Sequence, residues 1–433
     1  MDVLEDKIKE AKRFRDSYYY NFPQSTPEEK SQAVRAVVLP LIQDIPLDIN
    51  GQCSASANYN YLCGRILNIC EEYDANCERY LLRAVKLEPS MADAWHELGE
   101  CVWKKKDFKT ATDCYKKSLS YTRSAKCLAS LALALRYCAI QEKNVESQMK
   151  LHEEALQLCT EAVERNPNDE NAWQILGNSY LAQFFFKQQR DREPMGKARE
   201  AYERALQLTD KHCNACLHYN YSTVLKFNQE YRECLNHLMF ATLCDPRFSP
   251  AKEELEAIVS YLHRINLQVQ RKGKLSSKKV QQFQNAICNN DYGIYLKQRV
   301  RDKNGQEKML KAVSLQDLKE GVNDGVVICT RIIAVIPNHE TVPYTFVGID
   351  KEKTCCAFAV LNSSNLFGVV IGDSITVPEP HVIDVTIPAE ECKGENINFR
   401  IVRVTNPLFL LKNSKLLDIK CVAMCSMSTN FIS

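Results

Sequence analysis

Charged and amide side chains recur along the helical part of this sequence at positions where they could bind an extended peptide. Asparagine can donate and accept a hydrogen bond at once, and arginine can hold a carboxylate through two parallel bonds. Counted from Trp95 and Trp173, one face is expected to carry Glu97, Glu100, Lys104, Arg136, Asn171, Gln174, Asn178, Asn220 and Lys226. The alternative is a face that is merely solvated.

A second group of charges lies in a short basic segment, residues 271–285. It holds Arg271, Lys272, Lys274, Lys278 and Lys279 and no acidic residue. Such a segment can neutralise several phosphates and release their counterions. The alternatives are a solvated spacer and a weak nuclear-import signal.

Metal and catalytic motifs are weak by comparison. Cys213 and Cys216 form a single C-x2-C pair with His212 and His218 nearby, but no second pair lies at zinc-finger distance. No phosphate-binding loop, nucleophile elbow or HExxH motif is present in the sequence. We therefore expect no enzyme, no metal and no cofactor.

A repeated pair of helices is predicted to position the first group of side chains. The segment Ala94–Gly99 recurs at Ala172–Gly177, and Ala111, Tyr115 and Ser118 have the same spacing as Ala198, Tyr202 and Ala205. This pattern is typical of the tetratricopeptide repeat, in which small residues let two helices approach and large ones fill the space between repeats. Such units must stack, because one alone cannot bury its apolar face.

The repeat pattern divides the helical part of the chain. Residues 1–57 precede it and are predicted to form a helical cap or a degenerate repeat, with Thr26 capping a helix that starts at Pro27. Residues 58–270 form the repeat array, which ends in a capping helix from Pro250 to Gln270. Two units carry insertions, one at Gln141–Lys150 and one before Ala198. Residues 271–285 are predicted to be an exposed basic linker.

From Ala286 the pattern changes to short β-rich runs. They cover residues 326–329, 344–349, 355–361, 374–377 and 397–404, separated by Gly, Asn, Asp and Pro. Residues 286–433 are therefore predicted to form a small closed barrel of the five-stranded oligonucleotide/oligosaccharide-binding (OB) type. The fold class is mainly α with a C-terminal β domain: a tetratricopeptide solenoid followed by an OB-like barrel.

The predicted barrel carries aromatic residues that could stack on bases or fill its core: Tyr344, Phe346, Phe358, Phe367 and Phe399. Its sixteen Lys and Arg residues are balanced by sixteen Asp and Glu residues, so it lacks the positive charge typical of nucleic-acid-binding domains. Binding of protein is favoured over binding of single-stranded nucleic acid, and most of these aromatics are expected in the core.

Composition indicates a soluble folded protein with 45% hydrophobic and 25% charged residues and a net charge of +2. The start of the chain has no apolar segment typical of a secretory signal, and the apolar stretch from Leu128 to Ile140 is too short to span a bilayer. The 20 cysteines are scattered along helical patterns. We expect reduced packing residues in a protein of the cytoplasm and nucleus, with no membrane partner.

Two barrel segments, residues 321–327 (Gly-Val-Asn-Asp-Gly-Val-Val) and 369–380, resemble the barrel of the tetratricopeptide repeat protein 5 family. This family is also called Strap, the stress-responsive activator of a histone acetyltransferase. The order of parts agrees along nearly the whole chain: N-terminal helices, repeats with late insertions, a lysine-rich segment and an OB domain.

The resemblance implies two activities, a nuclear transcriptional cofactor scaffold and a ribosome-bound reader of nascent tubulin that triggers tubulin mRNA decay. It implies a ribosomal-RNA contact for the segment with Lys272, Lys274, Lys278 and Lys279. Arg136 matches the arginine that is thought to pair with the glutamate of the tubulin start, Met-Arg-Glu. Cys216 stands where the family is expected to offer an acid to the tubulin arginine.

The sequence thus predicts a non-enzymatic adaptor. Its concave groove would bind a short peptide or nascent chain. The resemblance implies the tubulin N-terminus as this chain and ribosomal RNA as the partner of the basic linker. Histone acetyltransferase complexes are a further predicted partner. The alternative is a single-stranded nucleic-acid binder that acts through the barrel.

Overall fold

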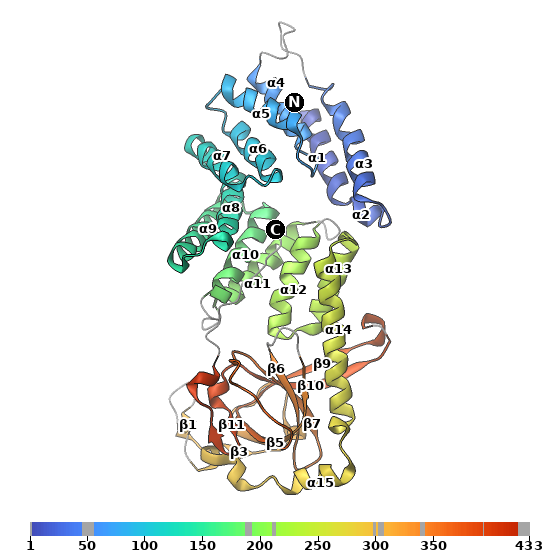
Figure 1. Cartoon of the computed structure of the whole chain (residues 1–433), viewed down its shortest axis with the longest axis vertical. Coiled ribbons are helices and arrows are strands. Elements are labelled where there is room, and N and C mark those ends of the chain that lie inside the picture. The colour runs from blue at the N-terminus through green and yellow to red at the C-terminus, as the bar shows by residue number, and fades with distance from the viewer. Residues whose placement is uncertain are drawn as a thin grey trace. The chain divides into compact units, whose positions relative to one another are not determined.

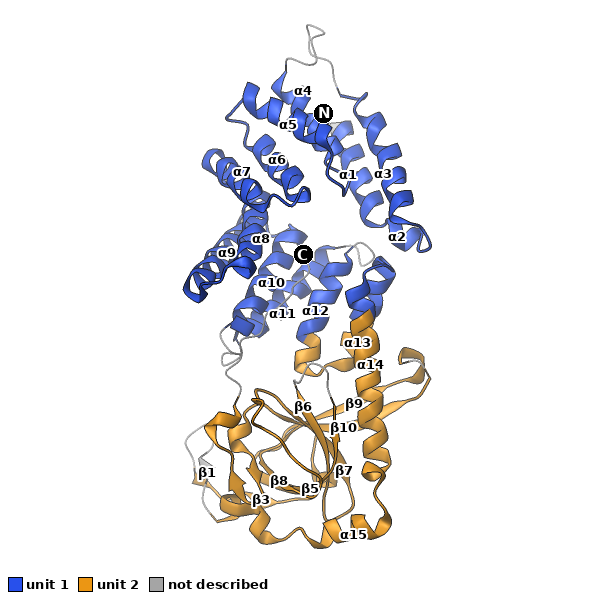
Figure 2. Cartoon of the chain, in the orientation of Figure 1, with its two compact units in different colours: residues 1–224, 237–252, 428–433 blue, residues 225–236, 253–427 orange. Residues whose placement is uncertain are grey.

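The chain folds into a helical part followed by a β domain, as the computed structural model in Figure 1 shows. The structure describes residues 2–45, 56–186, 193–209, 214–297, 300–301, 307–337, 343–392 and 394–422. These residues form two compact units (Figure 2). The first contains residues up to Val224 and His237–Lys252, and the second contains Leu225–Asn236 and the residues from Glu253 onward. The predicted fold class is confirmed.

Helices follow one another along the first part of the chain. The N-terminal ones are α1 (Asp2–Asp16), α2 (Tyr18–Asn21) and α3 (Pro27–Leu41). The repeat helices are α4 (Ala57–Leu67), α5 (Ala75–Leu87), α6 (Ala92–Lys104), α7 (Phe108–Tyr121), α8 (Ala125–Gln141), α9 (Val145–Arg165), α10 (Glu170–Phe186), α11 (Glu193–Leu208), α12 (Ala215–Asn228) and α13 (Tyr231–Cys244). They are followed by α14 (Ser249–Gln270).

The N-terminal helices pack like a further helix pair. Thr26 accepts a hydrogen bond from the backbone N–H of Glu29, whose side chain accepts in return from the N–H of Thr26, so the predicted cap is a complete capping box. Apolar residues of α1 and α3 form one buried cluster with those of α4, including Ile8, Val38 and Ile66. Hydrophobic burial therefore joins α1 and α3 to the array.

Two glycines allow the helices of a repeat to approach each other. A Cβ atom on Gly99 would lie 2.5 Å from the Tyr115 ring, and one on Gly177 would lie 2.8 Å from the Tyr202 ring. Tyr115 is 2% exposed and Tyr202 is fully buried. Each tyrosine ring thus fills the space that the glycine leaves empty, as the repeat pattern predicts.

The insertion predicted at residues 141–150 lengthens two helices. Helix α8 has 17 residues and α9 has 21, and only a short turn separates Gln141 from Val145. Asn144 caps α9 by accepting a hydrogen bond from the backbone N–H of Ser147. The second predicted insertion falls partly on residues 187–192, which lie outside the described residues.

The β domain is a closed barrel of the OB type. Its long strands are β5 (Val326–Ile336), β6 (Tyr344–Ile349), β7 (Cys355–Val360), β8 (Ser374–Pro378), β9 (His381–Ile387) and β10 (Ile397–Val404). Strands β5, β6 and β7 form an antiparallel meander, and β10 pairs in parallel with β7. Strand β8 pairs with β5 and β9 pairs with β10, so these two consecutive strands act as one bent strand that closes the barrel.

Short elements complete the domain. They are β1 (Val300–Arg301), β2 (Glu307–Lys308), β3 (Lys311–Ala312), β4 (Gly321–Val322), β11 (Leu411–Lys412) and β12 (Lys415–Leu416), with the 3-10 helices η3 (Asn289–Leu296), η4 (Leu315–Asp317), η5 (Ala389–Glu391), η6 (Pro407–Phe409) and η7 (Ile419–Cys421). The barrel core contains Ile328, Phe346, Phe358 and Val402.

The basic segment is folded, although the sequence predicts an exposed linker there. Lys272–Lys274 form the 3-10 helix η2, and Ser277–Asn285 form α15. Val280 and Phe283 of α15 are buried, and the Gln284 side chain donates a hydrogen bond to the backbone oxygen of Lys351 at 2.7 Å. Val280 and Phe283, an apolar pair at i and i+3, anchor the helix. In the sequence this pair is easily overlooked among the many lysines.

Helix α14 and the barrel belong to the same unit beyond residue 252. The Tyr261 hydroxyl shares a hydrogen bond of 2.7 Å with that of Thr345, and His263 bonds to the backbone oxygen of Cys392 at 2.9 Å. The predicted capping helix is therefore also part of the β domain's packing. None of the helices in the described residues combines the length and the apolar character needed to cross a membrane.

We predict opposite effects of alanine at two glycines of the same repeat. Gly177→Ala should destabilise the protein by about 1–3 kcal/mol, because the new methyl group overlaps the buried Tyr202 ring. Gly196→Ala should stabilise it by roughly 0.5–1 kcal/mol, since Gly196 is exposed in α11, has open space around it and gains helix propensity. Urea unfolding measures both, and equal effects of the two substitutions would contradict the close approach.

Candidate peptide-binding face

Glu97 is the centre of a charged cluster formed by the first helices of successive pairs. The carboxylate lies on α6 and is 6% exposed. It accepts hydrogen bonds from Lys126 of α8 at 2.9 Å and from the Asn68 amide at 2.8 Å. Burial alone would raise the pKa of Glu97, but Lys126, His96, Lys12 and the Asn68 bond hold it well below its ordinary value. Glu97 is therefore ionised and fixed in place.

Lys104 caps the end of the neighbouring helix. Its ammonium donates hydrogen bonds to the backbone oxygens of Asn68 at 2.5 Å and Cys70 at 2.6 Å, and to the Asn68 side-chain oxygen at 2.8 Å. These carbonyls follow the last turn of α4, where a cation is favoured by the helix dipole. Asn68 thus connects Lys104 to Glu97.

Two further cations reach the cluster from α1, which precedes the repeat array, and from α4, the first helix of the array. Arg65 of α4 forms a bidentate pair with Glu5 of α1, with N–O distances of 2.5 and 2.8 Å. Lys12 of α1 is half-buried, and its pKa is lowered first by burial and then by Lys126. Within the described part of the chain, no carboxylate lies within ion-pair distance of Lys12.

These residues define what we call the Glu97 cluster: Lys12, Arg65, Asn68, Glu97, Lys104 and Lys126. Four of its members are cations, and the two carboxylates paired with them belong to Glu97 and Glu5. Glu100 also attracts Lys104 and Lys126, so four cations face three carboxylates. The excess positive charge is felt at Lys12, whose pKa is lowered by Lys126. The arrangement can bind the carboxylate of a ligand.

The two other predicted residues on α6 and α8 differ in exposure. Glu100 is partly exposed; it accepts a hydrogen bond of 2.8 Å from the Tyr115 hydroxyl and lies 3.6 Å from His96. Arg136 is only 5% exposed, and burial lowers its pKa. Together with burial, Arg136 lowers the pKa of His152 to about 4, which places it beside α9. A ligand could reach little of the Arg136 guanidinium in this conformation.

Most of the predicted residues farther along the array have buried side chains. Gln174 accepts a hydrogen bond of 2.9 Å from Asn214, and Asn178 accepts one of 2.6 Å from the Tyr202 hydroxyl. Asn220 is fully buried, whereas Asn171 is exposed. Lys226 belongs to the second unit and pairs with Glu254 at 2.6 Å. The structure therefore brings Glu97 and Lys104 together but does not gather the whole predicted set.

The lysines of the basic segment lie on η2 and α15. Lys278 is exposed in the first turn of α15, and the Lys279 ammonium lies 4.8 Å from the centre of the Phe283 ring. Gly273 has a φ of +68° and packs closely on the backbone of Ile333, so Lys272 and Lys274 follow a fixed path along the barrel. Four cations are thus displayed on a folded surface.

The described residues contain no group of three or more His, Cys, Asp or Glu side chains suited to a metal ion. Cys213 and His212 lie outside the described residues, and burial raises the pKa of the Cys216 thiol to about 11. Four of the five aromatics considered for base stacking are buried, as expected for core residues: Phe346, Phe358, Phe367 and Phe399.

The sequence missed Lys12, Arg65 and Asn68 as members of the cluster. Lys12 lies in α1, within residues 1–57, which are predicted only as a cap or degenerate repeat. Arg65 and Asn68 lie in α4 and at its C-terminal cap, where the first repeat keeps Gly64 but lacks the Trp from which the face is counted. One available signal was the helical spacing of Leu4, Ile8 and Ala11, whose apolar stripe fixes which side of α1 carries Glu5 and Lys12.

A tetratricopeptide array followed by an OB barrel defines a class of protein-binding adaptors. Comparison with known proteins agrees: a family model for the "Tetratricopeptide repeat protein 5 OB fold domain" matches residues 309–426, and a tetratricopeptide-repeat model matches residues 92–124. Tetratricopeptide repeat protein 5 of Homo sapiens is 30% identical over 416 residues, covering 96% of this chain and 93% of that protein. The Mus musculus protein is 30% identical over 93% of this chain and 90% of its own length. The chain belongs to the tetratricopeptide repeat protein 5 family.

We predict that replacing Glu97 weakens the fold in a pH-dependent way. Glu97→Gln should destabilise the protein at pH 7 by roughly 1.5–3 kcal/mol, the usual worth of hydrogen bonds to a charged group. Because the folded pKa is lowered, this contribution is complete above the pKa of an unfolded Glu, about 4.3, and is lost as the pH falls through the folded pKa.

Urea unfolding of both proteins at several pH values measures the effect. The difference between them should be constant from about pH 7 to 5.5 and should shrink below the unfolded pKa of about 4.3. Glu154→Gln, an exposed change on α9, serves as the control and should alter stability little. A difference that grows on acidification would contradict the assignment.

Proposed function

We propose that this adaptor binds a short peptide through the Glu97 cluster, with a carboxylate of the peptide close to Lys12 and Lys126. The observation that carries the proposal is the excess positive charge at Lys12, which Glu97 attracts without forming an ion pair with it. Its half-buried ammonium has neither full hydration nor a carboxylate within ion-pair distance among the described residues. A ligand carboxylate would compensate it and form a charge-assisted hydrogen bond.

The resemblance to the family suggests the identity of the peptide. A nascent tubulin chain begins with Met-Arg-Glu, and its glutamate supplies the acid that the Glu97 cluster favours. Arg136 remains the residue that the resemblance assigns to this glutamate, although its 5% exposure makes Lys12 and Lys126 the more accessible cations. Cys216 offers no charge to the peptide arginine.

We further propose that the basic segment binds ribosomal RNA, which would hold the adaptor where a nascent chain emerges. The support is the set of four lysines on η2 and α15, a folded surface without a neighbouring acid in sequence. A role in histone acetyltransferase cofactor complexes is a proposal from the resemblance alone. These activities imply a protein of the cytoplasm and the nucleus.

The alternative, a single-stranded nucleic-acid binder acting through the barrel, has less support. Stacking needs exposed aromatic faces, and the buried positions of Phe346, Phe358, Phe367 and Phe399 remove most of the candidates. The barrel residues also carry no net positive charge.

A test of the peptide proposal uses Lys12→Gln. Fluorescence anisotropy would measure binding of a labelled peptide that starts Met-Arg-Glu, and of one that starts Met-Arg-Gln. The variant should bind the glutamate peptide about threefold to a hundredfold more weakly, as expected for the loss of one charge-assisted bond. Its stability should change little, because the variant loses both the repulsion between Lys12 and Lys126 and the attraction between Lys12 and Glu97.

The matched control is Lys116→Gln, which removes an exposed charge on α7. It should leave peptide affinity unchanged. Equal affinity of the wild-type protein for the two peptides would rule out a role for the carboxylate, whatever the variants do.

The RNA proposal predicts a loss of ribosome binding on charge reversal. Lys278→Glu with Lys279→Glu should sharply reduce co-sedimentation with ribosomes. The slope of the log binding constant against log salt concentration should also become shallower by about one unit for each phosphate that the protein no longer neutralises. The control is Lys116→Glu with Lys117→Glu, an adjacent pair whose second lysine also lies over an aromatic ring, that of Tyr121 at 5.0 Å. Ribosome binding that survives the first pair, or falls equally with the second, would contradict the proposal.

A further inference from the structure

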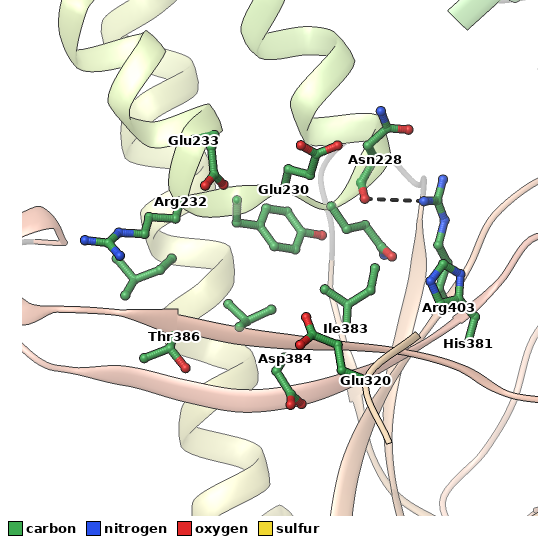
Figure 3. A pocket seen from close by; sticks show the side chains of 14 residues that line it. Asn228, Glu230, Arg232, Glu233, Glu320, His381, Ile383, Asp384, Thr386 and Arg403 are labelled. Carbon is green, nitrogen blue, oxygen red and sulfur yellow. Dashed lines mark hydrogen bonds between the residues drawn. The ribbon is translucent and has the colours of Figure 1, made fainter. Parts of the chain in front are cut away.

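The second unit contains a pocket that the proposed function does not use (Figure 3). It has a volume of about 490 Å³ and is bounded by the α12–α13 connection, the first turn of α13, strand β9, Glu320 and Arg403. Every one of these residues belongs to the second unit. It is therefore separate from the Glu97 cluster, which lies in the first unit.

Gln229 is a buried polar residue of this pocket. It is 2% exposed, has a φ of +63° and lines the pocket. Its amide interacts with the Tyr231 hydroxyl, which partly offsets the rise that burial causes in the pKa of that phenol. An amide has two N–H donors and an oxygen acceptor, so this one partner leaves hydrogen-bonding groups that a polar ligand in the pocket could use.

Carboxylates dominate the charge around the pocket. Glu230 and Glu233 come from the α13 side, and Glu320 and Asp384 come from the β side (Figure 3). Glu233 and Glu320 are exposed and form no ion pair among the described residues.

The pocket's two arginines are held by other groups. Arg232 makes two hydrogen bonds to Glu391, at 3.0 and 2.7 Å, and Arg403 donates to the backbone oxygens of Phe227 and Asn228, both at 3.3 Å. Glu391 thus neutralises Arg232, as Arg400 neutralises Asp384, whereas neutral carbonyls leave the Arg403 charge in place. The preference for a cation therefore belongs to the part of the pocket beside the exposed carboxylates of Glu233 and Glu320.

The pocket also borders an open sheet edge. Strand β9 pairs with β10 along residues 381–387, but on its other side β4 pairs only with His381 and Val382. Residues 383–387 of β9 line the pocket. In the described part of the chain, no strand pairs with these residues on the side opposite β10. An exposed edge of this kind can accept the backbone of an extended peptide as an added strand.

We propose that this edge and pocket bind an extended, arginine-containing segment of a partner protein. The peptide backbone would pair with β9 beyond Val382, and its arginine would enter between Glu233 and Glu320. A guanidinium fits better than an ammonium because it offers several donors in one plane and is weakly hydrated. The wall that it meets contains the apolar residues Ile383, Val385 and Ile387. The proposal adds a second protein-binding site and does not depend on the peptide at the Glu97 cluster.

Methyl NMR on the full chain tests the proposal, because Ile383 and Ile387 report from the pocket itself. The probe is the peptide acetyl-Thr-Val-Arg-Val-Thr-amide, compared with the same peptide carrying neutral citrulline in place of arginine. We expect saturable shifts of the Ile383 and Ile387 methyl signals with the arginine peptide. The citrulline peptide should bind at least about tenfold more weakly, since it loses the charge-assisted bonds.

The double variant Glu233→Gln with Glu320→Gln should bind the arginine peptide at least about tenfold more weakly. Both side chains are exposed, so the remaining methyl spectrum should be unchanged. Glu352→Gln, an exposed change in the β6–β7 turn, is the matched control and should bind normally.

Three outcomes would overturn the proposal. The first is the absence of shifts at the pocket methyl groups, and the second is an equal response to arginine and citrulline. The third is a saturable shift of the same methyl groups by an oligothymidylate, which would indicate a nucleic-acid site instead.

Discussion

The contact of a glycine in one helix with a tyrosine in the next organises the first unit. Gly99 faces Tyr115 and Gly177 faces Tyr202, and in each pair the ring occupies the volume that a Cβ atom would need. This contact draws the two helices of a repeat together and leaves the first helix free to meet the first helices of neighbouring repeats. Glu97, on the same helix as Gly99, meets Lys126 of the next first helix, α8. Lys12 comes from α1, which hydrophobic burial joins to α4.

Close packing also determines the electrostatics of the cluster. Once Glu97 is buried, an ionised carboxylate is tolerated only with hydrogen bonds and nearby cations, which Asn68 and Lys126 provide. Lys12 adds a charge that Glu97 alone does not balance. The same packing therefore stabilises the array and leaves positive charge in excess at the cluster. In the second unit the balance is reversed, since Glu233 and Glu320 leave negative charge beside an open strand edge.

The regular parts of the fold could be predicted because they depend on local patterns. The repeats follow from the Trp95 and Trp173 signatures, and the predicted strands at 344–349 and 397–404 coincide with β6 and β10. Strand β9 was not predicted, because Pro378 and Pro380 indicate the end of a strand. In the structure Glu379 adopts a φ of +44°, which lets the chain bend and continue on the other side of the barrel.

Side-chain burial and pairing were harder to predict than helices and strands. Helical spacing places Arg136 and Asn220 on a predicted face, but it cannot show that neighbouring helices cover them to 5% and 0% exposure. It also cannot show that Arg65 meets Glu5, because that pair joins helices 60 residues apart in sequence. These features depend on tertiary packing, which no local pattern contains.

The pKa of the Lys12 ammonium tests the central claim, that excess positive charge in the Glu97 cluster receives a ligand carboxylate. Titration of the Lys12 Nζ signal by NMR, with and without the Met-Arg-Glu peptide, measures it directly. Burial and Lys126 lower this pKa in the free protein, so a bound carboxylate should raise it. An unchanged or lower Lys12 pKa in the saturated complex would show that the carboxylate binds elsewhere and would contradict the account.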